Sequence, residues 1–552
     1  MNSFSLLRRF VVVVAILGVV TATAKPVSAV NIETATIADL QAAFADGSLT
    51  SVNLVRAYMK RIDAYDKQGP NINTVITFNS KALEEAKKCD AERKAGKSRG
   101  PLHGIPVVLK DNYDTFDMPT TAGSSMLKGS IPPDDAYVVK KLRDAGAIIL
   151  AKVNMSEFAS GGGSVGGAKD PAILKAGAVP NGYSSMGGQT RNPHALDRGP
   201  SGSSGGTGAA IAAVFAQFGL GTDTASSVRG PSSVNGIVGL KPTTGLMSRD
   251  GIVPLSLSLD TGGPMARSVY DIAVALNVMA GVDPADAMTA KSQGHIEKDY
   301  TVFLKKGALN GVRIGIARDF DGKDAAVDAV FNSAVESLRK LGAVTIDFKY
   351  PAYMLEGRAG AFNTVTQSEF KAQIATYLQK KTGPGYPKTL DDLVRISNDP
   401  SSGYPSPQKA FALRYSASVA LDLDDPVYLA AKNEGFAMVK AAVDAVMKKY
   451  QVDAIVYLSS PVGPAPIVPP ANPRYTDPTA QGFNISNMTG YPDLVVPAGM
   501  TTTGLPVTIS ILGPAFSDGK ILGYGYDFEQ ATHALQLPKY TPALPSDIVS
   551  KH

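Results

Sequence analysis

Residues 199–229 read GPSGSSGGTGAAIAAVFAQFGLGTDTASSVR, with serines crowded at both ends and an alanine-rich segment between them. The alanine-rich segment predicts a packed helix that sets the separation of the two serine groups. In the run FGLGTDTASSVRGP, which contains the second group, successive backbone N–H groups of small residues are suited to converge on one point and hold an oxyanion. A serine at its end would lie beside those donors. The alternative interpretation is an ordinary Gly/Ser turn before the strand GIVGLK.

The first serine group contains a GxSxG match that we do not interpret as a nucleophile elbow. The match GSSGG is centred on Ser204, and a second match, GGSVG, is centred on Ser164. A nucleophile elbow directly follows a buried hydrophobic strand, and neither ALDRGPS nor EFASG, which precede the two matches, has that pattern. Because the chain contains 54 glycines, such matches arise easily. We therefore expect neither a Ser-His-Asp hydrolase nor a nucleotide site at the GxGxxG match of residues 161–166.

Helix and strand patterns alternate on either side of this stretch, which predicts an α/β fold. TIADLQAAF opens an amphipathic helix that Thr36 caps. GIPVVLK (104–110) and AIILAKVN (147–154) read as short buried strands separated by the helical segment AYVVKKLRDAG. Residues 350–449 are mostly helical with irregular breaks, so we predict a helical insertion there. The Gly-, Ser- and Asn-rich residues 160–200 predict a functional loop region.

The composition argues against several other classes of protein. The chain has 552 residues, of which 44% are hydrophobic and 19% are charged, as in globular proteins. Its net charge of +5 is spread along the chain without a basic stripe, so we expect no nucleic-acid partner. The single cysteine, Cys89, excludes an intrachain disulfide and is expected at the surface of a helix or half-buried in it. None of the five histidines has the spacing of a metal ligand, so we expect no metal.

The first 29 residues have the three-part layout of a secretory signal peptide. Arg8 and Arg9 precede an apolar run over residues 10–20, and small residues follow, with cleavage plausible after Ala24 or Ala29. The apolar run is shorter than the roughly 18 residues that a membrane span requires, so we expect no stable span after cleavage. The sequence thus predicts an exported, periplasmic or secreted protein that folds over residues 30–552. Both the general and the twin-arginine export routes stay open.

Several motifs in order resemble the amidase signature family. They are GPLHGIPVVLKDNYDTFDMPTTAGS (100–124), GPSGSSGGTGAA (199–210), GLGTDTASSVRGPSSVNGIVGLKPTTG (219–245) and SRDGIVPLSLSLDTGGPMARSVYDIA (248–273). Within the family, the stretch NGYSSMGGQTRNPHALDRGPSGSSGG is most similar to the branch that includes bacterial peptide amidases. The resemblance implies a large mixed twisted β-sheet covered by helices on both faces. It also implies that the helical insertion at residues 350–449 shapes the substrate pocket.

The resemblance implies a Ser–cisSer–Lys triad and assigns each member by its own motif. Ser227, before VRGP, is the implied nucleophile; Ser203, in GSSGG, is the implied proton bridge after a cis Gly202–Ser203 bond; Lys110, in PVVLKDN, is the implied base. A lysine accepts a proton near neutral pH only if its charged form is disfavoured, and burial at the end of the GIPVVL strand would lower its pKa in that way.

The implied oxyanion donors are the backbone N–H groups of Thr224, Ala225, Ser226 and Ser227. Here the sequence departs from the commoner GTDTGGS, because Ala225 and Ser226 replace two glycines. Their Cβ atoms would be strained if the turn required a positive φ. Asp223 and Arg229 are expected to brace the loop from behind, and a plain surface ion pair is the alternative.

The implied activity is hydrolysis of a linear carboxamide to a carboxylic acid and ammonia or an amine through an acyl-enzyme, with no cofactor. The branch favours C-terminal peptide amides or amino-acid amides, and aryl or aliphatic amides are the alternative small-molecule substrates. An amidotransferase subunit would work in the cytosol beside partner subunits, which the signal peptide disfavours. A non-catalytic binding protein of the same fold is the remaining alternative. The sequence predicts no particular oligomeric state.

Overall fold

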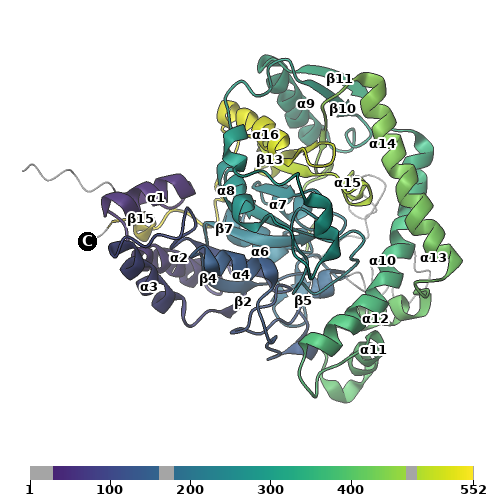
Figure 1. Cartoon of the computed structure of the whole chain (residues 1–552), viewed down its shortest axis with the longest axis horizontal. Coiled ribbons are helices and arrows are strands. Elements are labelled where there is room, and N and C mark those ends of the chain that lie inside the picture. The colour runs from purple at the N-terminus through teal and green to yellow at the C-terminus, as the bar shows by residue number, and fades with distance from the viewer. Residues whose placement is uncertain (1–28, 161–178, 468–481, 551–552) are drawn as a thin grey trace, which may run out of the picture.

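A computed structural model describes residues 29–160, 179–467 and 482–550 of the chain (Figure 1). Its centre is a mixed sheet of eleven strands. In spatial order these are β11 (Val344–Phe348), β10 (Arg313–Ala317), β12 (Ala454–Leu458), β14 (Pro506–Leu512), β13 (Asp493–Met500), β8 (Val238–Lys241), β9 (Thr261–Ala266), β7 (Phe218–Asp223), β3 (Pro106–Lys110), β4 (Ile148–Val153) and β2 (Val75–Phe78).

The sheet is mixed because two parallel groups flank a run of antiparallel strands. β10 pairs in parallel with β11 and β12, and β3 pairs in parallel with β4 and β7, whereas the strands from β12 through β7 otherwise pair antiparallel. Two short pairs lie outside the sheet: β1 (Val30–Asn31) with β15 (Ile548–Val549), and β5 (Tyr183–Ser184) with β6 (Gly188–Gln189).

The helices lie around this sheet. In chain order they are α1 (Ile37–Asp46), α2 (Ser51–Tyr65), α3 (Ala82–Lys94), α4 (Tyr137–Asp144), α6 (Gly205–Ala212), α7 (Arg229–Val234), α8 (Val269–Met279), α9 (Ala325–Lys340), α10 (Ala352–Lys381), α11 (Leu390–Asn398), α12 (Pro407–Val419), α13 (Pro426–Ala430), α14 (Phe436–Tyr450), α15 (Asn484–Thr489) and α16 (Asp518–Thr532). Within the described ranges, none of them combines the length and the apolar character that crossing a membrane requires.

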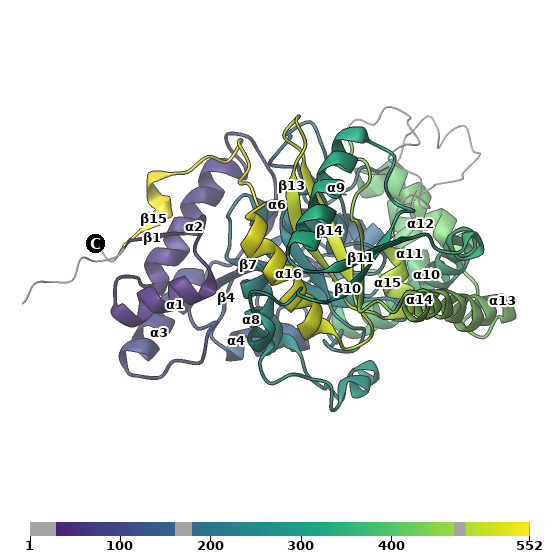
Figure 2. The same cartoon turned by 90° about the horizontal axis from the view of Figure 1, so that it is seen from above.

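Strand β12 shows that both faces of the sheet are covered. Side chains of successive strand residues point to opposite faces. Ala454, Val456 and Leu458 belong to the large core that also holds buried residues of α8, α9 and α16. Ile455 and Tyr457 belong instead to a second core with residues of α14 and α15. The two layers of helices are visible in Figure 2, and the fold expected from the resemblance is confirmed.

The predicted helical insertion, residues 350–449, corresponds to α10 to α14, of which α14 ends one residue later at Tyr450; these helices form the rim on the right of Figure 1. Helix α10 has 30 residues and at 1.5 Å per residue is about 45 Å long. Its middle part packs beside the end of β4, where the Phe158 and Phe370 rings have centroids 6.2 Å apart. A third core joins α10, α11 and α12 to this region and to the loop that contains Val253 and Leu255. Helices α10 to α12 therefore pack against the loop after β4 and the loop that contains Val253 and Leu255.

The segment FGLGTD differs from the expectation, because it forms strand β7 in the middle of the sheet and not part of a donor nest. A Cβ on Gly219 would lie 2.7 Å from Thr207 Cγ2, and one on Gly221 would lie 2.7 Å from Ser204 Oγ. Helix α6 approaches this strand so closely that only glycine fits at these two positions. The glycines removed the hydrophobic alternation that identifies strands, so the sequence signal was lost.

Other local expectations have mixed outcomes. Thr36 and Asp39 form the predicted capping box of α1, and the alanine-rich segment contributes the buried helix α6. Cys89 lies on α3 as predicted, but the exposure predicted for it is wrong: it is 3% exposed and donates to the Gly146 carbonyl at 3.6 Å, because this side of α3 faces the chain before β4. The predicted signal peptide, apart from residue 29, and the Ser164 match lie outside the described residues.

Candidate active site

Lys110 is the last residue of β3 and is fully buried. Its Nζ lies 2.8 Å from Ser203 Oγ, 2.7 Å from Thr222 Oγ1 and 3.4 Å from the Thr222 carbonyl oxygen. Burial lowers the pKa of Lys110 to about 7, because the ammonium loses its water, although the carboxylates of Asp223 and Asp260 act in the opposite direction. A large fraction of this lysine is therefore neutral near pH 7 and has a lone pair to accept a proton.

Ser203 is presented to Lys110 by a backbone with little freedom. The Gly202–Ser203 peptide bond is cis, and the Ser203 carbonyl accepts a hydrogen bond from the Ser156 amide at 2.9 Å. A Cβ on Gly202 would lie 2.4 Å from Ser156 Oγ, so a side chain does not fit there. The strand end at β4 and the glycine before Ser203 together fix the serine hydroxyl against the lysine.

Ser204 has a structural role, as the missing strand before GSSGG predicts. Its hydroxyl donates to the Thr222 carbonyl at 3.2 Å and accepts from the Thr222 amide at 3.2 Å. These two contacts tie the start of α6 to β7. The Ser204 side chain is completely buried and points at the strand backbone, so it is not available to a substrate.

The backbone of Ser227 is hydrogen bonded to the residue that follows Ser203. The Ser204 amide donates to the Ser227 carbonyl at 3.2 Å, and Ser227 is 7% exposed. In the described part of the chain, no hydrogen bond joins the hydroxyls of Ser203 and Ser227. The structure thus brings Lys110 and Ser203 into direct contact and places Ser227 beside them on the neighbouring loop.

The loop of residues 224–227 uses its carbonyl groups, and not its amides, in hydrogen bonds with the rest of the described structure. The Ala225 carbonyl accepts from Arg229 Nη2 at 3.1 Å, and the Ser226 carbonyl accepts from the Gly230 amide at 2.6 Å. Because a trans peptide directs its N–H opposite to its carbonyl, the N–H groups of Ser226 and Ser227 point to the other side. Among the described residues, neither these two amides nor that of Ala225 has a hydrogen-bond acceptor. Backbone donors without a protein partner beside a serine are what an oxyanion site requires.

Ala225 and Ser226 replace glycines without straining this loop. Neither residue has a positive φ, whereas the structure records positive φ at neighbouring non-glycine positions such as Ser201 (61°). Both side chains are half-buried at the surface of the loop. The strain that a left-handed turn would have imposed on their Cβ atoms is therefore absent.

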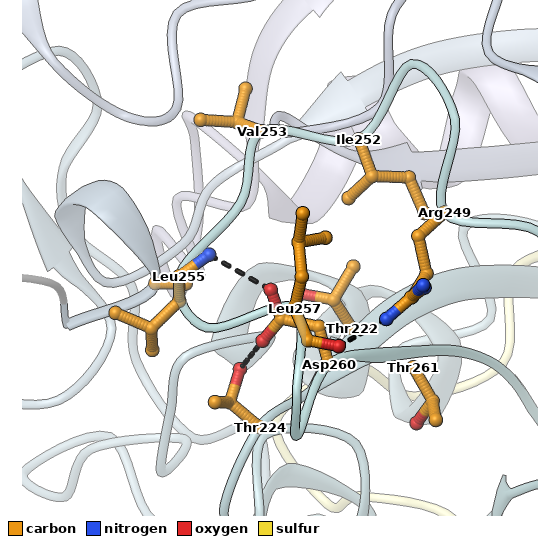
Figure 3. Close-up of a pocket in the computed structure, with 10 residues that line it drawn as sticks. Thr222, Thr224, Arg249, Ile252, Val253, Leu255, Leu257, Asp260 and Thr261 are labelled. Carbon is orange, nitrogen blue, oxygen red and sulfur yellow. Dashed lines mark hydrogen bonds between the residues drawn. The ribbon is translucent and has the colours of Figure 1, made fainter. Parts of the chain in front are cut away.

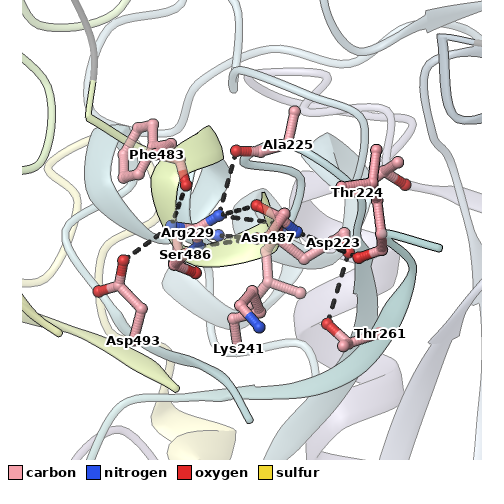
Figure 4. Close-up of polar contacts among 12 residues, drawn as sticks. Asp223, Thr224, Ala225, Arg229, Lys241, Thr261, Phe483, Ser486, Asn487 and Asp493 are labelled. Carbon is pink, nitrogen blue, oxygen red and sulfur yellow. Dashed lines mark hydrogen bonds and ion pairs between the residues drawn. The ribbon is translucent and has the colours of Figure 1, made fainter. Parts of the chain in front are cut away.

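Asp223 and Arg229 hold the ends of the loop together from behind (Figure 4). The Asp223 carboxylate accepts from the backbone amides of Val228 at 3.0 Å and Arg229 at 3.3 Å, across the loop from its own strand. The Arg229 guanidinium donates to Asp223 through Nε at 3.1 Å and Nη2 at 3.0 Å. Its other contacts include the Asn487 side chain at 2.6 Å, the Phe483 carbonyl at 2.7 Å and Asp493 at 2.7 Å.

Both members of this ion pair stay charged. Burial alone would raise the pKa of Asp223 and lower that of Arg229, because each charge loses water. Their attraction outweighs burial: Arg229 brings the pKa of Asp223 down to about 2, and Asp223 with Asp493 raises the pKa of Arg229 above its ordinary value. Both side chains are 0% exposed, so they are not a surface ion pair.

A small cavity adjoins the loop, and apart from Thr224 its polar residues were not identified from the sequence (Figure 3). Asp260 lies at its base and accepts a hydrogen bond from Thr224 Oγ1. Thr222 lines the same cavity and accepts from Asn112 Nδ2 at 3.0 Å as well as from Lys110. The remaining lining residues are mostly apolar: Ala159, Ile252, Val253, Leu255 and Leu257, with Arg249 and Thr261 at the edge. Threonines and a lone aspartate have no spacing pattern, so only the fold brings them to Lys110.

Two further features are the possible metal ligands and the contacts of Asn154. In the parts of the chain that the structure describes, no three His, Cys, Asp or Glu side chains are grouped so as to bind a metal ion. Asn154, which follows β4, is saturated by structural contacts to Gly182, Gly188 and Thr190, and its oxygen accepts from Ser184. It therefore supports the loop of residues 182–190.

Comparison with known proteins gives a consistent relationship. The Amidase family profile matches residues 53–522. The chain is 34% identical to a glutamyl-tRNA(Gln) amidotransferase subunit of Thermoanaerobacter pseudethanolicus, covering 90% of this chain and 96% of that protein. It is 32% identical to a probable amidase of Arabidopsis thaliana, with 93% of each chain covered.

The solved structures agree. The native peptide amidase from Stenotrophomonas maltophilia is 38% identical to this chain and superposes with a TM-score of 0.83, covering 92% of this chain and 99% of that one. With the profile match over residues 53–522 and the sheet, loop and lysine–serine pair described above, these similarities show that the chain belongs to the amidase family of amide-hydrolysing enzymes.

Proposed function

We propose that the protein hydrolyses linear carboxamides through an acyl-enzyme, with Ser227 as nucleophile, Ser203 as proton bridge and Lys110 as base. The observation that carries this proposal is the 2.8 Å contact between Lys110 Nζ and Ser203 Oγ, buried beside a loop whose amides are unpaired. A base, a relay and oxyanion donors are the groups that serine-based acyl transfer requires.

In the acylation step, neutral Lys110 takes the proton of Ser203 while Ser203 takes the proton of Ser227. The Ser227 oxygen then forms a bond to the amide carbon, and the carbonyl electrons move to the oxygen. The amides of Ser226 and Ser227 stabilise that oxyanion. When it collapses, the C–N bond breaks, and the proton returns from Lys110 through Ser203 to the leaving nitrogen, which departs as ammonia or an amine.

In the deacylation step, water replaces the amine. Lys110 and Ser203 remove a proton from the water, whose oxygen attacks the ester carbon of the acyl-Ser227. The ester C–O bond breaks, the proton passes to the Ser227 oxygen, and the carboxylic acid leaves. One buried lysine therefore serves as base and acid in turn, because its pKa of about 7 makes both protonation states accessible near neutral pH.

The triad is tested by ammonia release from S227A, S203A and K110A. We expect losses of about 1,000-fold or more for S227A and K110A, by analogy with removal of nucleophile or base in serine hydrolases. S204A is the matched control, because this adjacent serine is equally buried and contacts only backbone, and it should stay near the parental rate. A sulfonyl fluoride should label Ser227 in the parent. Full turnover by S227A, or a change in K110A confined to stability, would refute the mechanism.

For the substrate, we propose C-terminally amidated peptides or amino-acid amides. The 38% identity and 0.83 TM-score to a peptide amidase support this choice. Aryl or aliphatic amides are the alternative within hydrolysis. Ammonia release from an amidated dipeptide, a free-acid dipeptide, glutamine, an aryl amide and a fatty amide distinguishes them, and activity on the amidated dipeptide alone is the expected result.

A second candidate function is that of an amidotransferase component, which the 34% identity to a glutamyl-tRNA(Gln) amidotransferase subunit favours. The signal-peptide pattern of residues 1–29 supports the hydrolase, because an amidotransferase acts in the cytosol. Glutamine as the only substrate turned over, together with retention in the cytosol of the producing cell, would favour the amidotransferase. No labelling of Ser227 and no ammonia from any substrate would favour a non-catalytic binding protein.

A further inference from the structure

Asp260, which precedes β9, has a buried carboxylate that accepts hydrogen bonds from three donors. It is not a member of the proposed triad. It is 6% exposed. Thr224 Oγ1 donates to one carboxylate oxygen, and the amides of Leu255 and Ser256 donate to the other at 2.9 Å each. Figure 3 shows the carboxylate between Thr224 and the loop of residues 254–260. It thus connects Thr224, the first residue of the loop of residues 224–227 (the oxyanion loop), to a second loop, residues 254–260, that lines the cavity.

The second loop is itself fixed to helix α10. Glu369 of α10 accepts from Ser256 Oγ at 2.7 Å and from the Ser258 amide at 3.0 Å, and Gln373 accepts from the Leu257 amide at 2.8 Å. Asp260 therefore belongs to a loop that is hydrogen bonded to Thr224 on one side and to helix α10 on the other. A carboxylate supported in this way can hold Thr224 in one position through the reaction.

Two carboxylates, Asp223 and Asp260, act on Lys110, and the charge of Asp260 is the less neutralised by a neighbouring cation. Asp223 is neutralised by Arg229, in direct contact. Arg249, the cation that faces Asp260, is engaged by Asp286 in an ion pair of its own. Among the described residues, Asp260 forms no salt bridge. The groups that face Lys110 are thus a compensated carboxylate on β7 and a nearly uncompensated one before β9.

We propose that Asp260 is a positioning residue of the active site: its carboxylate fixes Thr224 at the start of the oxyanion loop and its charge acts on the Lys110–Ser203 relay. This inference rests on the proposed function. Asp260 does not touch the reacting atoms; it acts through Thr224 and through its field at Lys110. Its loss should therefore affect turnover and the pH profile more than substrate binding.

The pH consequence has a definite sign. Burial raises the pKa of Asp260 to about 6, so the group is ionised near pH 7 and favours the ammonium form of Lys110. Asparagine removes the charge, so Lys110 should lose its proton at lower pH. The acidic limb of kcat/KM, which reports conversion of the ammonium to the neutral base, should then move to lower pH in D260N.

The experiment compares D260N, T224V and the double variant with the parent in kcat, KM and the pH profile of kcat/KM. Asparagine keeps an oxygen for the Leu255 and Ser256 amides and an NH₂ for the Thr224 hydroxyl. We expect D260N to lower kcat at the plateau by about 10- to 100-fold with KM nearly unchanged, as for misplacement of a catalytic group, and to shift the limb to lower pH. T224V should lower kcat without a shift, and the double variant should resemble D260N.

The controls make each outcome decisive. D250N, an Asp→Asn change on the same segment, should leave the profile unchanged. If D260N does not fold, T224V carries the test, and T224S, which keeps the hydroxyl, should restore kcat. A D260N limb that coincides with the parental limb, or kcat losses that multiply in the double variant, would overturn the inference. Failure of the triad itself would be seen separately, as full turnover by S227A in the parent background.

Discussion

At the scale of single residues, Lys110 has opposing effects on stability and activity. The fold buries its amine, which lowers its pKa to about 7 and makes it a base, but the charged form is then held away from water. Because the pKa of Lys110 is lower in the folded than in the unfolded protein, its burial reduces the free energy of unfolding. This reduction is complete below the folded pKa and disappears as the pH rises towards the ordinary value of 10.5. Activity has the reverse dependence, because catalysis needs the neutral form.

We therefore predict that kcat/KM falls about tenfold per pH unit below pH 7 in the parent. K110M should lose activity, yet its melting temperature should be no lower than that of the parent, and the gain should be larger at pH 6 than at pH 9. Thermal unfolding at the two pH values measures this. A K110M variant that melts lower at pH 6 would show that the lysine stabilises the fold.

Ala225 allows a prediction about the unusual loop sequence. Because its φ lies outside the left-handed region, glycine is not needed there, and the alanine reduces the freedom of the unfolded chain. A225G should keep kcat within about threefold and lower the free energy of unfolding by about 0.4–1 kcal/mol. Denaturant unfolding and ammonia release measure the two effects. A225G that is both more stable and faster would show that the alanine strains the loop.

At the scale of elements, the oxyanion loop depends on the elements that flank it. Strand β7 supplies Asp223, the start of helix α7 supplies Arg229, and residues from α15 and β13 complete the contacts of the guanidinium. The geometry of the loop is thus set by two regions that are distant in sequence, one formed by β7 and α7 and the other by α15 and β13. Only the planar guanidinium reaches all of these partners at once.

R229K should therefore be severe although the charge is kept. A lysine leaves either the Ala225 carbonyl or a buried carboxylate unpaired, so we expect kcat to fall about 100-fold and stability to fall by about 3–5 kcal/mol. R318K, at an arginine whose side chain is 21% exposed and pairs with Asp321, is the control and should change stability by less than about 1 kcal/mol. Parental kcat in R229K would mean that the loop does not depend on this contact.

The elements also show what the sequence predicts and what it does not. GIPVVLK and AIILAKVN are strands β3 and β4, because apolar runs bounded by turn residues carry their own signal. β7 was missed, since close packing of α6 requires glycines that erase the pattern. Lys110, Ser203 and Ser227 were identified by resemblance to a family. Asp260 and Asn487 were missed, because their roles come from contacts between distant segments that no local motif encodes.

At the scale of the whole molecule, the two chain ends are tied together. β1 pairs with β15, and buried Arg61 of α2 forms an ion pair with Asp547 and donates to the Thr541 carbonyl at 2.9 Å. Arg61 also pairs with Glu33 at 3.3 Å. Residues near the C-terminus of the described chain therefore complete the hydrogen bonding of a buried charge in its second helix.

This closure predicts a stability effect without a direct catalytic one. D547N removes a buried partner of Arg61, so we expect the free energy of unfolding to fall by about 3–5 kcal/mol. The kcat of the folded protein should be unchanged, because the site lies elsewhere. Deleting Lys551 and His552 alone is the control and should leave the melting temperature unchanged. A fall in kcat of folded D547N would connect the closure to the active site.

The position of Arg61 has a consequence for the time at which the molecule becomes stable during synthesis. Two partners of this guanidinium, the Thr541 carbonyl and Asp547, lie 480 and 486 residues further along the chain. A ribosome makes a protein from its N-terminus, so Glu33 is available to Arg61 early, but almost the whole polypeptide must be made before Arg61 gains its C-terminal partners. Until translation ends, the nascent N-terminal segment lacks its final contacts and is easier to unfold than the finished enzyme.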